Sequence, residues 1–269
     1  MATQAQVGLS SDNAGGLTAF IDRWIYVFMA ALFFVTVLVG FIPDSLMKIE
    51  MVRAGERPPF PAILHVHAVL MGMWLLLLMA QTSLMATGRK AMHMQLGVAG
   101  MILMPAIVIT GVILVPTIYG QIYSQFRSVP PEAAQAMAPF VDYIGNIALL
   151  QFSAAIGFPL LVIFALRARR NRPDLHKRLI ILATSIPLPA AIDRITWLPH
   201  SFPEGALSVS LYPQLVIAPM FLWDLYRLGR IHSAYWIYLA VFIPLAVAKE
   251  ILWGSDWWLA TVPSLMGQG

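Results

Sequence analysis

The segment Leu64–Thr87 reads LHVHAVLMGMWLLLLMAQTSLMAT and decides the fold class, because it is long, apolar and free of Asp, Glu, Lys and Arg. Lipid offers no hydrogen bonds to a peptide backbone, so an apolar run of about 20 residues is typical of a helix that spans a membrane. Six further runs of this kind predict an all-α fold, a polytopic bundle of seven transmembrane helices. The predicted spans are Trp24–Ile42, Leu64–Thr87, Leu96–Tyr119, Ile144–Leu166, Leu179–Leu198, Leu207–Leu228 and Ala234–Trp253.

The composition of the whole chain agrees with a membrane protein. Of its 269 residues, 59% are hydrophobic and 11% are charged, whereas soluble domains usually carry about 25% charged residues. The absence of cysteine excludes a disulfide scaffold, a thiolate nucleophile and an iron–sulfur cluster. No P-loop, nucleophile elbow, His-Glu-x-x-His or dinucleotide fingerprint is found. The expected surroundings are a lipid bilayer, and no nucleic-acid partner is expected.

The charges predict an orientation. With seven spans, 11 of the 17 basic residues but only four of the 13 acids fall on the face that holds the N-terminus. By the positive-inside rule this face is cytoplasmic, and the C-terminus is periplasmic, in the inner membrane of a bacterium. We expect residues 1–23 to be a cytoplasmic tail, 24–253 the transmembrane domain and 254–269 a periplasmic tail. The basic residues concerned are Arg23, Arg89, Lys90, Arg167, Arg169, Arg170, Arg172, Lys177, Arg178, Arg227 and Arg230.

The connections on the outer face are predicted to be long. They are Pro43–Ile63 and Gln121–Tyr143, and the second is expected to hold a short amphipathic helix around Glu132–Phe140. Prolines are predicted to interrupt several spans and leave backbone groups free to line a cavity. They are Pro105, Pro187, Pro189, Pro213, Pro219 and Pro244.

Ionisable and polar residues within the spans are candidate functional residues, because burying one costs roughly 2.5–3.5 kcal/mol at mid-membrane. They gather near the outer ends of four spans, which leaves two interpretations. The first is a set of interhelical salt bridges, such as Asp193 with Lys249 or Arg194 with Glu250. The second is a ligand, proton or metal pocket. Its candidate residues are Asp142, Gln151, Asp193, Arg194, Lys249 and Glu250, with His65, His67 and His200 as candidate metal ligands.

The opposite face carries two histidines at the starts of helices. His93 and His176 lie in a weak internal repeat at an offset of 83 residues. Two imidazoles from facing helices are what six-coordinate haem iron requires. The alternative is that both, like His232, are juxtamembrane anchors beside arginines and lysines. Small residues are expected to leave room for the macrocycle (Gly97, Gly100, Ala183).

Two segments resemble an uncharacterised family of bacterial multi-pass membrane proteins. They are Leu64–Gly97, with Thr-Gly-Arg ending one helix and His-x-x-Leu-Gly opening the next, and His176–Leu179. The histidine placement is more distantly similar to the ascorbate-reducible transmembrane cytochrome b family. That resemblance implies a four-helix core with two b haems, one held by His93 and His176 and the other by His67. Since Leu150 stands opposite His67 in the repeat, with Gln151 beside it, at most one haem is expected.

The sequence supports two functional hypotheses and a structural alternative. The first is a redox protein that binds haem b between His93 and His176 and uses the outer polar residues for a substrate, a quinone or protons. The second is a transporter, a small-molecule-binding protein or a membrane subunit of a larger complex. Its proton- or metal-binding pocket, with His67, Asp193 and Glu250, opens to the periplasm. In the structural alternative all of these residues serve packing and anchoring.

Overall fold

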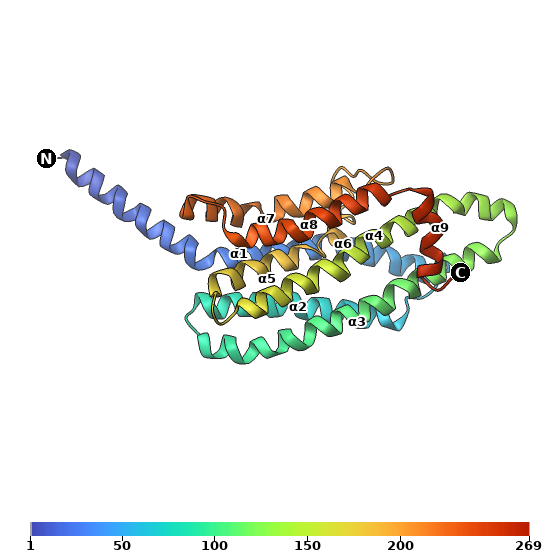
Figure 1. Ribbon diagram of the computed structural model, residues 1–269, viewed down its shortest axis with the longest axis horizontal. Coiled ribbons are helices and arrows are strands. Elements are labelled where there is room, and N and C mark those ends of the chain that lie inside the picture. The colour runs from blue at the N-terminus through green and yellow to red at the C-terminus, as the bar shows by residue number, and fades with distance from the viewer. Residues whose placement is uncertain (1, 269) are drawn as a thin grey trace.

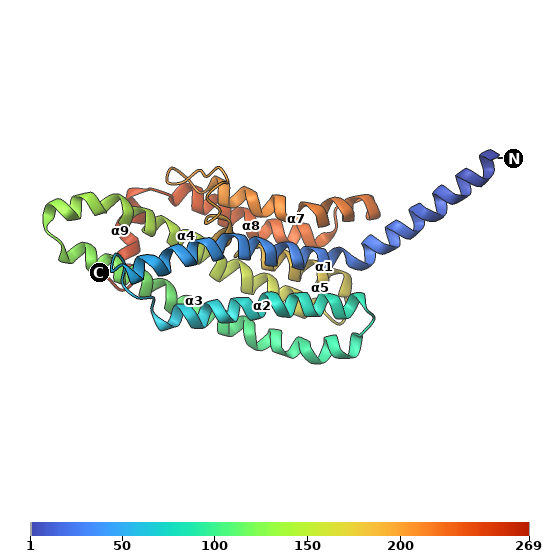
Figure 2. The same ribbon diagram turned by 180° about the vertical axis from the view of Figure 1, so that it is seen from behind.

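The computed structural model of the chain describes the backbone of residues 2–268 and the side chains of residues 16–268. Within this range the fold is all-α, without β-strands, and the long helices run side by side in an elongated bundle (Figures 1 and 2). The helices are α1 (Ala2–Arg53), α2 (Ala62–Ala86), α3 (Lys90–Ser128), α4 (Pro131–Ala168), α5 (Pro173–Ser185), α6 (Pro189–Ile192), α7 (Leu207–Leu228), α8 (Ser233–Leu252) and α9 (Asp256–Leu265).

Within the described residues, six helical stretches are long and apolar enough to cross a membrane. They overlap six of the seven predicted spans and agree with a multi-pass helical fold. The remaining predicted span, Leu207–Leu228, is helix α7, but it is not one of the six because polar residues interrupt its apolar sequence (Ser208, Ser210, Gln214, Asp224). The six stretches are Gly16–Arg53, Ala62–Ala86, Lys90–Ser128, Pro131–Ala168, Pro173–Ile192 and Ser233–Leu252.

The outer surface of the bundle is apolar. Val69, Ile102 and Leu215 are 62%, 66% and 66% exposed, and many other large apolar side chains are similarly uncovered. Soluble monomers rarely expose apolar surface on this scale, since water penalises it. The helices therefore present the kind of surface that lipid chains cover.

The core lies around α5, against which α1, α4, α7 and α8 pack. Phe33 of α1, Leu179 of α5 and Tyr238 of α8 are almost completely buried there. Helix α1 approaches α6 so closely that a Cβ atom at Gly40 would collide with the main-chain carbonyl of Ala191. The lack of a side chain at Gly40 is what permits this contact.

Several helices are longer than predicted. Helices α3 and α4 have 39 and 38 residues, so at 1.5 Å per residue each is nearly 60 Å long, about twice the thickness of a hydrocarbon core. The short helix predicted around Glu132–Phe140 is the first part of α4 and no separate element. The predicted connection Pro43–Ile63 is helical as far as Arg53.

The bounds predicted for the fifth span, Leu179–Leu198, were wrong. Helix α5 starts at Pro173 and ends at Ser185, and only the short α6 follows it. Pro187 and Pro189 cause this break because they lack the N–H groups that would continue the helix. The other prolines predicted to interrupt spans lie inside continuous helices instead (Pro105, Pro213, Pro219, Pro244).

The segment 254–269, predicted as a tail, contains α9, which packs against α4. Ser255 caps α9 by accepting a hydrogen bond from the N–H of Trp258 at 3.3 Å. The indole N–H of Trp258 donates to the carbonyl oxygen of Gly145 in α4 at 2.9 Å. Within the described residues this segment is therefore part of the bundle.

The bundle has two chemically different ends. The α2–α3, α4–α5 and α7–α8 connections lie together at one end, on the left in Figure 1. We call it the basic end, after Arg89, Lys90, Arg169, Arg170, Arg172 and Arg230 in or beside these connections. The α3–α4 connection and α9 lie at the other, which we call the distal end.

Candidate functional site

Two histidines occupy equivalent positions in the hairpins α2–α3 and α4–α5. His93 lies in the first turn of α3, with its Nδ1 3.4 Å from the carbonyl oxygen of Gln81 in α2. His176 lies in the first turn of α5, with its Nδ1 2.9 Å from the carbonyl oxygen of Ala165 in α4. Because a carbonyl oxygen only accepts, each Nδ1 is the donor, which leaves Nε2 as the free nitrogen. Metal-binding histidines are commonly held in this way.

The two imidazoles lie on helices that do not pack extensively on each other. Helices α3 and α5 are not among the extensively packed helix pairs in the described part of the chain, although an electrostatic interaction connects His93 and His176. Two imidazoles from different helices are the kind of axial donors that haem iron takes. The donor chemistry of these residues therefore fits a bis-histidine haem.

The small residues predicted to make room for the macrocycle lie beside neighbouring side chains. A Cβ atom at Gly97 would lie 3.4 Å from Nε2 of Gln81, and one at Gly100 would lie 3.4 Å from Cδ2 of Leu77, both in α2 and both ordinary contact distances. Ala183 is fully buried in the core. Room for a macrocycle beside these residues stays a prediction.

The third histidine of the basic end is occupied by structural contacts. The Nδ1 of His232 accepts a hydrogen bond from the N–H of Ala234 and caps α8 at 3.1 Å. Its Nε2 lies 2.9 Å from the Asp174 carboxylate. With both ring nitrogens engaged, His232 anchors the α7–α8 turn to the start of α5.

The histidines toward the distal end do not come together. His67 Nδ1 bonds the hydroxyl of Thr110 in α3 at 2.9 Å, His65 is exposed at the start of α2, and His200 stacks on Phe202. No group of three His, Cys, Asp or Glu side chains suited to a metal ion occurs in the part of the chain that the structure describes. The structure therefore does not assemble the metal site considered for His65, His67 and His200.

The ion pairs of Asp193 and Arg194 involve a helix that the sequence did not indicate. The Arg194 guanidinium contacts the Asp193 carboxylate at 2.8 Å and that of Asp44 in α1 at 3.2 Å. Lys48 completes the cluster by contacting Asp44 at 2.7 Å. The pairs Asp193–Lys249 and Arg194–Glu250 are not formed, because α1 supplies the partner carboxylate.

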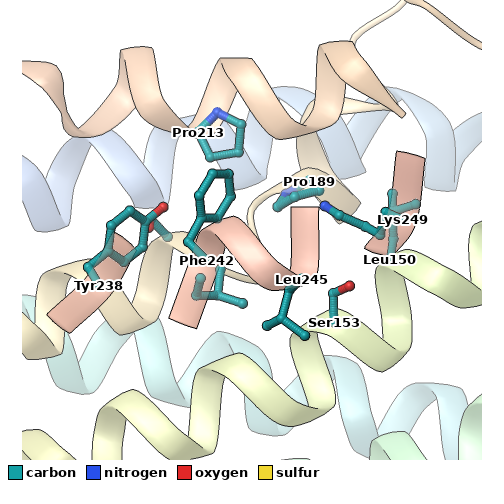
Figure 3. Close-up of a pocket in the computed structure, with 10 residues that line it drawn as sticks. Leu150, Ser153, Pro189, Pro213, Tyr238, Phe242, Leu245 and Lys249 are labelled. Atoms are coloured by element: carbon teal, nitrogen blue, oxygen red, sulfur yellow. The ribbon is translucent and has the colours of Figure 1, made fainter. Parts of the chain in front are cut away.

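The remaining residues of the predicted polar pocket point in different directions. Gln151 and Glu250 are exposed, and a Cβ atom at Gly205 would lie 3.5 Å from the Glu250 carboxylate. Lys249, next to Glu250, is instead only 5% exposed. It lines a small internal cavity between α4, α5, α7 and α8 (Figure 3). The predicted polar layer is thus divided among separate sites.

Asp142 lies at a second, larger cavity of about 200 Å³ near the distal end. Tyr119, Tyr123 and Phe126 project into it from one face of α3, while Asp142 comes from α4. Tyr119 and Tyr123 stack with ring centroids 5.7 Å apart. The wall is completed by apolar residues of α4 and α9 (Ala138, Val141, Leu259, Val262, Pro263). Aromatic rings around one carboxylate are the chemistry that recognises an organic cation.

A buried ion pair between α5 and α7 was not predicted from the sequence. Arg178 donates to the Asp224 carboxylate through Nε at 2.8 Å and Nη2 at 2.5 Å, and both side chains are less than 10% exposed. Tyr235 of α8 donates to the same carboxylate at 2.6 Å. The signal was the position of Arg178 on the apolar face of α5 that contains Leu175 and Leu182.

No protein-family model, curated protein or solved structure matches the chain.

Proposed function

We propose that the protein is a redox protein of the bacterial inner membrane that binds one haem b between His93 and His176. The observation that carries the proposal is that both imidazoles are held through Nδ1 by main-chain carbonyl oxygens of the preceding helix. This contact fixes the ring and directs Nε2 away from that helix. Bound haem supplies one-electron transfer. A quinone in the lipid or a partner membrane subunit would exchange the electrons.

The same proposal includes seven membrane crossings, with α7 as the sixth in chain order. At 22 residues this helix is about 33 Å long, sufficient for a hydrocarbon core, and it runs alongside the other helices (Figure 1). The basic end then faces the cytoplasm by the positive-inside rule, which puts the haem near the cytoplasmic surface.

The absorption spectrum tests the haem proposal directly. Wild-type protein purified in mild detergent from haem-replete cells is expected to give a Soret band and a reduced-minus-oxidised spectrum of a b-type cytochrome. His93→Ala and His176→Ala should each lose the low-spin spectrum, because iron loses one axial nitrogen. His65→Ala, which removes an exposed histidine outside the pair, should keep it. A colourless wild-type preparation refutes the proposal.

A second candidate function rests on the cavity around Asp142. Its three aromatic side chains and one carboxylate favour a small organic cation, since ring faces attract positive charge and the carboxylate neutralises it. The cavity contains no Lys or Arg among its lining residues. The protein would then bind or transport an amine or quaternary ammonium compound from the distal, periplasmic side.

Calorimetric titration of the purified protein with choline or tetramethylammonium tests this candidate. We expect binding that falls at least tenfold in Asp142→Asn, since about 1.4 kcal/mol corresponds to tenfold. Tyr123→Ala should weaken it similarly. Glu132→Gln is the control, because Glu132 is an exposed acid of the same helix and does not line the cavity. Equal binding by wild type and Asp142→Asn, or none by wild type, would count against a cation site.

A further inference from the structure

Lys249 of α8 is a buried charge that forms no ion pair with any described residue. Among the described residues, the buried charged side chains are Arg178, Asp224 and Lys249, and the first two pair with each other. Lys249 is 5% exposed, and no hydrogen bond or ion pair of its side chain occurs in the described part of the chain. Burying an ammonium group without a paired counter-charge costs much free energy. We therefore expect a ligand to bind beside Lys249 and neutralise its charge.

The surroundings of Lys249 form a small, partly open site. Its side chain projects into a cavity of about 20 Å³ and points toward Pro189, at the break between α5 and α6 (Figure 3). Hydroxyl groups enter the wall from two other helices, Ser153 of α4 and Ser185 of α5. Ser185 lies beside the phenol of Tyr238, which precedes Lys249 on α8 and lies on the other side of the cavity in Figure 3. A cavity of this size holds about one water-sized group. A quinone or a sulfate ion is too large for it.

The charges around the cavity favour an anion. None of the residues that line it is acidic. Glu250, about 100° around α8 from Lys249 and exposed, attracts the ammonium group electrostatically but forms no ion pair with it. Asp193 is paired with Arg194. The hydroxyls of Ser153 and Ser185 now donate to main-chain carbonyls, each at 2.8 Å. A hydroxyl rotates to suit its partner, so the hydroxyl of Ser153 can donate to an anion beside Lys249.

We propose that Lys249 and Ser153 bind one monovalent anion of halide size within the bundle. The ammonium group of Lys249 supplies the charge, and the Ser153 hydroxyl supplies a directional hydrogen bond from α4. The apolar wall, which includes Leu150, Phe242 and Leu245, keeps water out and strengthens the electrostatic attraction. The site is independent of the proposed haem and of the cavity at Asp142.

Thermal unfolding in detergent tests the site, with sodium chloride or bromide compared against sodium gluconate at equal ionic strength. The midpoint of the wild type is expected to rise with halide concentration, since a ligand that binds only the folded state stabilises it. Lys249→Met should unfold at or above the wild-type midpoint in gluconate, because it removes an unpaired buried charge, and should not respond to halide. Lys48→Met, outside the cavity, should keep the wild-type halide response.

Line broadening of the ³⁵Cl NMR signal by the purified full-length protein gives a second measurement that does not depend on unfolding. Wild type should broaden the signal, bromide should compete, and Lys249→Met should abolish the effect. Ser153→Ala should weaken chloride affinity by about tenfold, the size expected for one lost hydrogen bond to a charged group. The proposal is overturned if wild type shows no halide-specific effect, or if Lys249→Met retains it.

Discussion

At the scale of single residues, the bundle contains buried charges of two kinds, one paired with an opposite charge and one not. Arg178 and Asp224 neutralise each other, and Tyr235 adds a further hydrogen bond to the carboxylate. Lys249 is equally buried but has no partner from the described chain. A paired charge connects two helices of the bundle, whereas an unpaired buried charge indicates a site where a ligand binds.

Breaking the Arg178–Asp224 pair is expected to destabilise the protein strongly. Asp224→Asn should lower the free energy of unfolding by about 3–5 kcal/mol, because it leaves the Arg178 guanidinium buried without a counter-charge. The double variant Arg178→Met with Asp224→Leu should recover most of that loss. Unfolding in mixed micelles measures both. Glu50→Gln, which removes an exposed partner of Arg53, should change little, and an equally small effect of Asp224→Asn would contradict the argument.

At the scale of elements, the spans were predictable but their ends were not. The apolar runs of α2, α3 and α8 are found as helices because each run is local in sequence and needs only lipid or apolar neighbours around it. The break at Pro187 and Pro189 was predicted, but the end of that span was not, since apolar composition continues to Leu198 while α6 ends at Ile192. Of the six prolines predicted to interrupt spans, four stay inside continuous helices, and only Pro187 and Pro189, two apart, end one.

At the scale of the whole molecule, the charge difference between the two ends predicts the orientation in the membrane. The chain contains no cysteine, so a single introduced cysteine reports on which side of the membrane it lies, and no native cysteine reacts with the reagent. Ser264→Cys and Glu204→Cys, at the distal end, should react with a membrane-impermeant maleimide in intact cells. Asn171→Cys and Arg230→Cys, at the basic end, should react only after permeabilisation. If Glu204→Cys and Arg230→Cys react from the same side, α7 does not cross the membrane.

By itself the sequence determined the helical membrane class, most of the spans and the uneven distribution of charge, because each depends on local composition. It also located His93 and His176 at equivalent helix starts, since both follow short basic connections. The tertiary structure alone decided which polar groups meet: Asp44 pairs with Arg194, whereas Lys249 pairs with none of the side chains that the structure describes. Spacing along one helix sets angles within that helix, but the rotation of each helix against its neighbours depends on packing across the whole bundle.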